Sequence, residues 1–178
     1  MVARGWLRAV ITLLIAVGPA ACGASPTNPS AVGRLSIRMT DAPIQEVTEV
    51  NVYIEGLKVK RVDEPEQRVA ADIGLVDLLT LQNTSMLLAT VGAELAEYEF
   101  IMVELDQERS HLLLGSTQVG LKIPSEKIKV LGGFEVTEEM TTIVTLDFDA
   151  QQSLKQLGNG DWLMTPVIVI AAVEVVES

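Results

Sequence analysis

The chain has one cysteine and one histidine among its 178 residues. The lone cysteine, Cys22, excludes an intramolecular disulfide. Nucleophilic catalysis needs a nucleophile beside a base that a third group orients, and His111 is the only imidazole. No glycine-flanked serine elbow is present, and nothing marks a serine–lysine pair. We therefore expect a protein that is not an enzyme, with His111 in a solvent-exposed hairpin loop.

Basic residues are also few, since 13 Lys and Arg stand against 24 Asp and Glu. Two of them, Arg4 and Arg8, lie in the first 21 residues, so the remainder has 11 basic and 24 acidic residues, a net charge of −13. Binding to nucleic acids relies on Lys and Arg that neutralise phosphates, and anionic headgroups attract basic segments. We therefore expect no nucleic-acid partner, and no binding of anionic lipid by the folded part.

No uncharged hydrophobic run approaches the roughly 20 residues that a membrane-spanning helix needs. The most hydrophobic stretch, residues 9–17, follows Arg4 and Arg8 and leads through small residues to Cys22. This arrangement is typical of a secretion signal and resembles a bacterial lipobox, with Pro19 at the usual leucine position. We predict a lipoprotein signal peptide over residues 1–21 and acylation of Cys22. The alternative is ordinary cleavage nearby, which would leave a free thiol.

Residues 22–32 are small, polar and rich in proline, a composition that predicts a flexible tether. A lipid on Cys22 would make the membrane the first partner and would localise the protein to the cell envelope. Gly23 follows the cysteine, and by resemblance to enterobacterial sorting this residue favours the outer membrane. We therefore expect a position at the outer membrane, the cell surface or its periplasmic face.

Alternation between apolar and polar residues begins at residues 33–43, where Leu35, Ile37 and Met39 share one side of a predicted strand. Eight or nine such strands follow, with short helices predicted at residues 86–89 and 150–157. No long amphipathic helix and no alternating helix–strand pattern is present. We predict an all-β fold over residues 33–178, an antiparallel β-sandwich of the immunoglobulin- or prealbumin-like, Greek-key type. A barrel is the second choice.

The inward faces of the predicted strands define an expected hydrophobic core. Its members are Leu35, Ile37, Met39, Val50, Val52, Ile54, Ile101, Val103, Leu105, Val144, Leu146 and Phe148.

Several segments resemble, in order and spacing, the bacterial and archaeal domain-of-unknown-function family 4382. They are LSIRMTDAP at 35–43, VDLLTLQN at 76–83, EYEFIMVEL at 97–105, IPS at 123–125, LDFDAQQSL at 146–154 and LMTPVIVI at 163–170. The departures are Ala96, where the family commonly has glycine, and Glu126-Lys127 in place of a basic-glycine pattern. The resemblance implies an exported, often lipoprotein-anchored β-rich domain, and it implies no particular activity.

Three aspartates are the candidate polar site. Asp147 and Asp149 lie two residues apart on a predicted strand, with side chains about 6.5–7 Å apart along it, so they could act as an acid/base pair or hold a metal. Together with Asp41 they could bind calcium, although no calcium-loop spacing is present. The structural alternative, which we favour, has Asp147 facing water. It has Asp41 and Asp149 accepting hydrogen bonds from backbone N–H groups just downstream, Asp149 as a helix cap.

Trp162 is the one candidate platform for stacking a sugar, because the chain beyond the leader has only six aromatic residues. Packing at the rim of the sandwich is the alternative role for this side chain.

These observations predict a lipid-anchored, non-enzymatic envelope protein whose β-sandwich binds or scaffolds an envelope protein or a glycan. The alternatives are a metal-dependent or carboxylate-based hydrolase at Asp41, Asp147 and Asp149, and a carbohydrate-binding module that uses Trp162. No cofactor is expected, and calcium is the only candidate.

Overall fold

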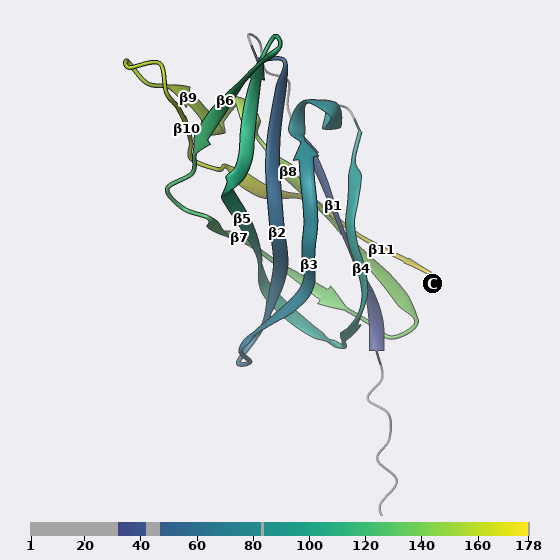
Figure 1. Ribbon diagram of the computed structural model, residues 1–178. Coiled ribbons are helices and arrows are strands. Elements are labelled where there is room, and N and C mark those ends of the chain that lie inside the picture. Colours follow the sequence, from purple (N-terminus) through teal and green to yellow (C-terminus); the bar gives the residue numbers. More distant parts are fainter. Residues whose placement is uncertain (1–31, 42–46, 83, 178) are drawn as a thin grey trace, which may run out of the picture.

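The computed structural model describes residues 32–41, 47–82 and 84–177 (Figure 1). The predicted signal peptide, Cys22 and the predicted tether up to residue 31 lie outside the described residues. The first strand begins at Val32, one residue before the predicted domain boundary.

Two packed β-sheets make up the domain (Figure 1). The first sheet has four strands in the order β11 (Ile168–Glu177), β8 (Met140–Phe148), β1 (Val32–Asp41) and β4 (Met86–Glu94). The second runs in the order β3 (Glu66–Asp77), β2 (Glu49–Arg61), β5 (Ala96–Leu114), β6 (Thr117–Lys122), β10 (Trp162–Met164) and β9 (Leu154–Gln156), with β7 (Lys127–Val136) also paired to β5. Two helical turns are described, η1 (Leu78–Leu81) and α1 (Ala150–Ser153). The prediction of an all-β sandwich is confirmed.

Strand β5 organises the second sheet because it is 19 residues long and has neighbours on both sides. β2 pairs along one side of it, while β7 pairs with residues 96–104 and β6 with residues 111–114 on the other. Side chains on both faces of its first half are buried, as the apolar run over residues 98–105 predicts. Ile101 points into the sandwich, and Phe100 lies on the opposite face yet is only 3% exposed.

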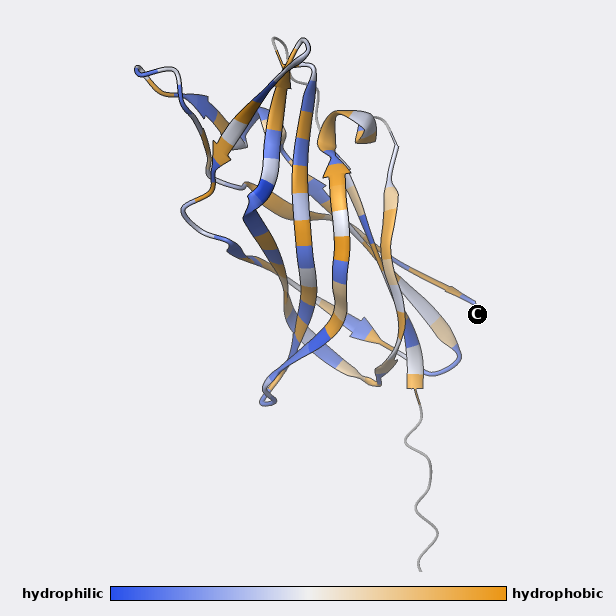
Figure 2. Ribbon diagram, viewed as in Figure 1, coloured by the Kyte–Doolittle hydropathy of each residue, from blue (hydrophilic) through white to orange (hydrophobic). Residues whose placement is uncertain are grey.

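The core lies between the two sheets, and every predicted core residue is buried, with at most 2% of its surface exposed. Hydrophobic and hydrophilic residues alternate along the strands that enclose it (Figure 2). The predicted change of phase at Gly56 is also present, as a register irregularity between Ile54 and Gly56.

Both predicted helices need correction. Residues 86–89 are not helical but begin β4, because they pair with β1, and this long-range pairing overrides their helix propensity. The helix predicted over residues 150–157 stops at Ser153, because Leu154–Gln156 forms β9 and pairs with β10.

Two strand pairings are parallel in a sandwich predicted to be antiparallel. β1 pairs in parallel with β8, and β6 with β10. Parallel neighbours need crossover connections, and local sequence patterns carry no information about which distant strands will meet. His111 is also corrected, since it lies half-buried within β5, opposite Asn51 and Gly120, and not in a loop.

Phe148 tests the core, because it is fully buried where β1, β8 and β11 meet. Replacing it with alanine is expected to lower the free energy of unfolding by about 3–5 kcal/mol, measured by urea denaturation. The matched control is Leu131→Ala on β7, where 71% of the side chain is exposed, with an expected change within about 0.5 kcal/mol. Equal effects of the two substitutions would contradict this assignment of the core.

Candidate functional site

Asp41, Asp147 and Asp149 are brought to one end of the sandwich by the parallel pairing of β1 with β8. Asp41 lies opposite Phe148 in this pairing, and Asp147 lies opposite Thr40. Helix α1 begins directly after β8. Two strands that run in the same direction therefore deliver all three aspartates to the start of one helical turn.

The side chains of Asp41 and Asp149 both hold backbone N–H groups of this turn. Asp41 Oδ1 accepts a hydrogen bond from the Ala150 N–H, with a donor–acceptor distance of 2.8 Å. Asp149 Oδ1 accepts one from the Gln152 N–H, also at 2.8 Å, so Asp149 is the N-cap of α1, as predicted.

Ser153, the last residue of α1, connects Asp149 to the segment that leads into β11. Its hydroxyl donates to the carbonyl oxygen of Asp149 and accepts from the Val167 N–H at 2.8 Å. The Ser153 carbonyl accepts from the Thr165 N–H, and the Asp149 N–H donates to the carbonyl of Val167. The bonds to Thr165 and Val167 satisfy backbone groups in the segment between β10 and β11.

One expected role of Asp41 falls on a part of the chain that the structure does not describe. Asp41 was predicted to accept from N–H groups in its own turn before Ile44, and that turn lies outside the described residues. Among the described residues, Asp41 also has a partner that the sequence did not indicate, the N–H group of Ala150, 109 residues further along the chain. Asp41 therefore joins two distant segments, and its side chain is 5% exposed.

Asp147 points away from the core. It was predicted to face water, but in the structure it is half-buried. Burial raises the pKa of Asp147, and the negative charge of Asp149 raises this pKa further. A raised pKa is a property that an acid/base carboxyl would need. In the described part of the chain, however, no group of three or more His, Cys, Asp or Glu side chains is arranged to hold a metal ion. Calcium binding by the three aspartates is the untested alternative to the structural role that we favour.

Trp162 lies on β10, where it pairs with Leu121 of β6 and Gln156 of β9. The indole is partly buried and packs against the hydrophobic core. Its Nε1–H is buried and has no hydrogen-bond partner among the described residues. These contacts are those of a rim-packing tryptophan, the alternative role considered for this residue.

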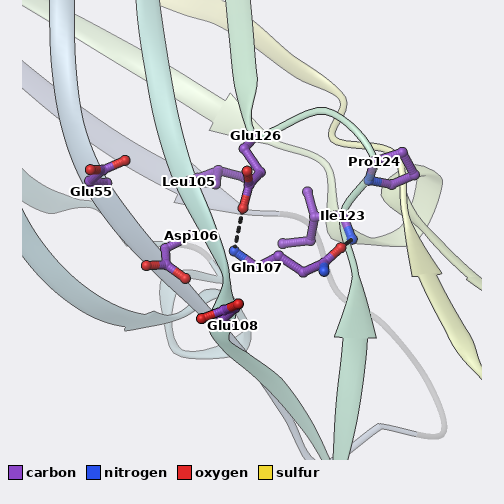
Figure 3. Close-up of a pocket in the computed structure, with 8 residues that line it drawn as sticks. All are labelled: Glu55, Leu105, Asp106, Gln107, Glu108, Ile123, Pro124 and Glu126. Atoms are coloured by element: carbon purple, nitrogen blue, oxygen red, sulfur yellow. Dashed lines mark hydrogen bonds between the residues drawn. The ribbon is translucent and has the colours of Figure 1, made fainter.

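An acidic hollow that the sequence patterns did not indicate lies between β5 and the loop that joins β6 to β7 (Figure 3). It has a volume of about 510 Å³, and four carboxylates contribute to its wall. They are Glu55, Asp106, Glu108 and Glu126. Gln107 also lines the hollow and joins its two sides, since its backbone N–H donates to Glu126 Oε1 at 2.9 Å and its side-chain Oε1 accepts from the Ile123 N–H at 2.7 Å.

The hollow exists because β5 leaves the regular ladder after Asp106. Asn51 pairs with His111 and Tyr53 with Asp106, so β5 makes an excursion of several residues against β2. The Ser110 hydroxyl replaces the missing ladder bonds, donating to the Asp106 carbonyl and accepting from the Tyr53 N–H. Arg109 then folds back onto Asp106, and this hydrogen bond lowers the pKa of the Asp106 carboxyl.

A second polar cluster lies on the outer face of the second sheet, around Glu104, which is 2% exposed. Lys58 Nζ lies 2.6 Å from Glu104 Oε1, and Lys127 Nζ lies 4.0 Å from the same oxygen. Arg68 binds the other carboxylate oxygen, Oε2. Gly56 makes room for this arrangement, because a Cβ there would lie 2.2 Å from Arg68 Nη1. We call Glu104, Lys58, Arg68 and Lys127 the Glu104 cluster.

Burial alone would raise the pKa of Glu104. The hydrogen bond from Lys58 and the positive charges of Arg68 and Lys127 outweigh burial and hold the pKa below its usual value. Glu104 is therefore an anion at neutral pH, and the native state gains stability from its charge. The sequence signal that could have revealed the cluster is an acidic residue inside the apolar run of residues 98–105.

The fold and these clusters define a two-sheet β-sandwich domain in which buried carboxylates connect distant strands. No helix in the described part of the chain is long and apolar enough to cross a membrane. The family model described as "Domain of unknown function (DUF4382)" matches residues 32–166, and the chain belongs to this family. No curated protein matches the chain, and no solved structure does.

Substitutions of Asp149 distinguish a helix cap from a metal ligand. Asp149→Ala is expected to lower the free energy of unfolding by about 1 kcal/mol, within a range of roughly 0.5–2, and Asp149→Asn by much less, since asparagine also caps. Urea denaturation measures both, and added calcium should leave the melting temperature of the parent unchanged. A melting temperature that rises with calcium in the parent and not in Asp149→Asn would show that the aspartate binds metal.

Glu104→Gln is expected to destabilise the protein at pH 7, because it leaves Lys58 and Arg68 without their anion. Since the folded pKa lies below the usual value near 4.3, the stabilisation is complete above that pH and is lost as the pH falls through the folded pKa. Urea midpoints of parent and variant should therefore converge in strong acid.

The control is Glu99→Gln, because Glu99 is a half-exposed carboxylate whose Oε2 lies 3.4 Å from Lys60 Nζ. This surface pair is expected to contribute less than about 1 kcal/mol. A gap between parent and Glu104→Gln that stays constant down to pH 2 would mean that the charge of Glu104 does not stabilise the fold.

Proposed function

We propose that this protein is a lipid-anchored envelope protein whose β-sandwich binds or scaffolds another molecule and performs no chemistry. The anchor is Cys22, the leader is residues 1–21, and residues 22–31 are the tether, since β1 begins at Val32. The family assignment supports a β-rich domain and carries no activity with it. The proposal therefore rests on how the chain enters the domain.

The observation that carries the proposal is the separation of the chain's entry point from the opposite end of the sandwich. Val32 begins β1 at one end, beside the β4–β5 turn, since Val32 pairs with Glu94. The β5–β6 hairpin at Gly115 and Ser116 and the turn over residues 157–161 lie at the opposite end (Figure 1). A protein held at residue 22 would thus present these turns away from the membrane.

The dimensions suit this arrangement. The ten residues of β1 alone span roughly 30 Å, at about 3.3 Å per residue. A flexible tether of ten residues adds an average reach of roughly 17 Å. The distal turns would therefore stand several nanometres from the lipid, where an envelope protein or a glycan can reach them.

The contacts of the candidate site residues favour binding over the two alternative functions. Asp41 and Asp149 each accept a hydrogen bond from a backbone N–H group, which is a structural task. Trp162 is partly buried and packs against the core, which leaves less of its surface to stack a sugar. The hydrolase and the carbohydrate-binding module considered from the sequence relied on these same side chains, the hydrolase together with Asp147.

Cys22→Ala is the direct test of the anchor. The variant is expected to move from the membrane fraction to the soluble envelope fraction, because the acyl chains contribute roughly 0.8 kcal/mol per buried methylene and no other lipid anchor is proposed. Fractionation with immunoblotting measures the shift, and mass spectrometry of the parent should find acyl groups on Cys22. Ser25→Ala in the tether is the control and should stay with the membrane. Retention of Cys22→Ala in membranes would refute the lipid anchor.

A further inference from the structure

Strand β11 forms one edge of the first sheet. Among the described residues it pairs only with β8, antiparallel, from Ile168 to Glu177. The N–H and C=O groups on its other side therefore have no strand beside them in this part of the chain. Such an edge is a template for adding another strand.

The side chains of β11 are unusually apolar for an edge strand, and they are exposed on both faces. Val169 and Val176 lie on the outer face of the sheet, in register with Asp147 and Thr141. Val173 and Val175 lie on the inner face, in register with Val144 and Thr142. All four valines are 41–51% exposed. A strand that is apolar on both faces is expected to be covered on both.

The second sheet covers only the beginning of β11. Ile170 packs over Gly132 of β7 so closely that a Cβ at Gly132 would lie 2.9 Å from Ile170 Cδ1. The second half of β11 extends beyond this contact toward the C-terminal end of the described chain (Figure 1). The four exposed valines flank and follow the contact with β7, so the uncovered region is the outer side of β11 and its second half.

Other edges of the two sheets carry devices that discourage pairing, whereas β11 has only Glu174, Glu177 and the register irregularity between Ile170 and Ala172. β3 has Arg68 and Asp72 along its length, with the backbone of Asp72 and Gly74 at positive φ. β9 is only three residues long and contains Lys155. β4, at the other edge of the first sheet, lies beside β3 (Figure 1). β11 contains no lysine, arginine or proline, the residues that most often protect an edge.

We propose that β11 pairs with β11 of a second copy of this chain, antiparallel and about a two-fold axis at Val173. The axis places Val173 opposite its own copy and Ala172 opposite Glu174 of the partner. Because the β11–β8 register shifts between Ile170 and Ala172, Ile170 then meets Val175 and Val169 meets Val176. Every pair joins side chains on the same face of the sheet, so the valines on each face cover one another.

The glutamates of β11 select this orientation. In the antiparallel pairing Glu174 faces alanine and Glu177 faces Ile168, so no two carboxylates lie opposite each other. Parallel pairing in register would stack each glutamate on its own copy, and directly opposed like charges are destabilising. The interface is self-complementary and closes after two chains, as a two-fold contact requires.

The dimer would join two four-stranded sheets into one continuous sheet of eight strands. The proposed dimer goes beyond the proposed anchoring. It does not depend on the anchor, because the contact uses residues of β11, which are distant in sequence from Cys22. If the anchor is also present, the dimer would carry two lipid groups and hold the membrane by both. Failure of either proposal leaves the other intact.

The first test measures the molar mass of the full-length chain in mild detergent by sedimentation, across a range of concentrations. The parent is expected to be a dimer, and Val175→Lys to weaken the dimer by about tenfold or more, because the lysine would have to be desolvated in the interface. Leu131→Lys is the matched control, since this exposed leucine neighbours the β7–β11 contact at Gly132 but lies opposite Phe100, on the outer face of the second sheet. A parent that stays monomeric, or that forms species larger than a dimer, would overturn the proposal, as would equal effects of the two lysines.

The second test uses a cysteine at the proposed axis. Residues opposite one another in an antiparallel pair have Cβ atoms about 4.5–5.5 Å apart, close to the span of a disulfide. Val173→Cys in the full-length chain should therefore form a covalent dimer under mild oxidation, seen as doubled mass on a non-reducing gel. The parent, with Cys22 alone, and Leu131→Cys should not. Cross-linking that is equal at positions 131 and 173 would refute the two-fold contact.

Discussion

The parallel pairing of β1 with β8 is the constraint on which the rest of the sandwich depends. It is an unusual contact, because most neighbouring strands in this fold are antiparallel, and it brings Asp41 to the start of α1. The hydrogen bond from Ala150 to Asp41 then closes the first sheet at the point where β8 ends. From there Ser153 holds the segment that carries the chain from the second sheet back to the first. Without this pairing neither the turn of α1 nor the approach to β11 would have its present partners.

Local patterns in the sequence predicted what depends on neighbouring residues. The alternation of Leu35, Ile37 and Met39 identified the inward face of β1, and the same reasoning located the irregularity at Gly56. The cap at Asp149 was also predictable, since it involves a donor only three residues away. Each of these features is determined within a few residues, where strand and cap preferences act.

What could not be predicted involves partners far apart in the chain. Asp41 is of a residue type that is common in turns, and nothing near it in the sequence indicates a hydrogen-bond donor 109 positions away. Met86, Leu87 and Leu88 are good helix formers, and only the presence of β1 beside them makes a strand. The Glu104 cluster needs Gly56, Arg68 and Lys127, which lie on three different strands. In the sequence its charged residues are therefore far apart, and each reads as an independent surface residue. The acidic hollow has the same origin, because it arises from an excursion of β5 against β2.

The distribution of charge and apolar surface distinguishes the two sheets. On the outer face of the second sheet, charged side chains cover the strands, and Lys129 even lies over the ring of Phe100. The first sheet ends in β11, whose exposed residues are mostly valine. The match to the family model stops at Pro166, two residues before β11 begins, so the family model does not account for this apolar edge. A strand that is needed to cover β8 could be as charged on its free side as β3 is. That β11 instead keeps valines on both faces is the feature of this chain that a single copy of the fold does not explain.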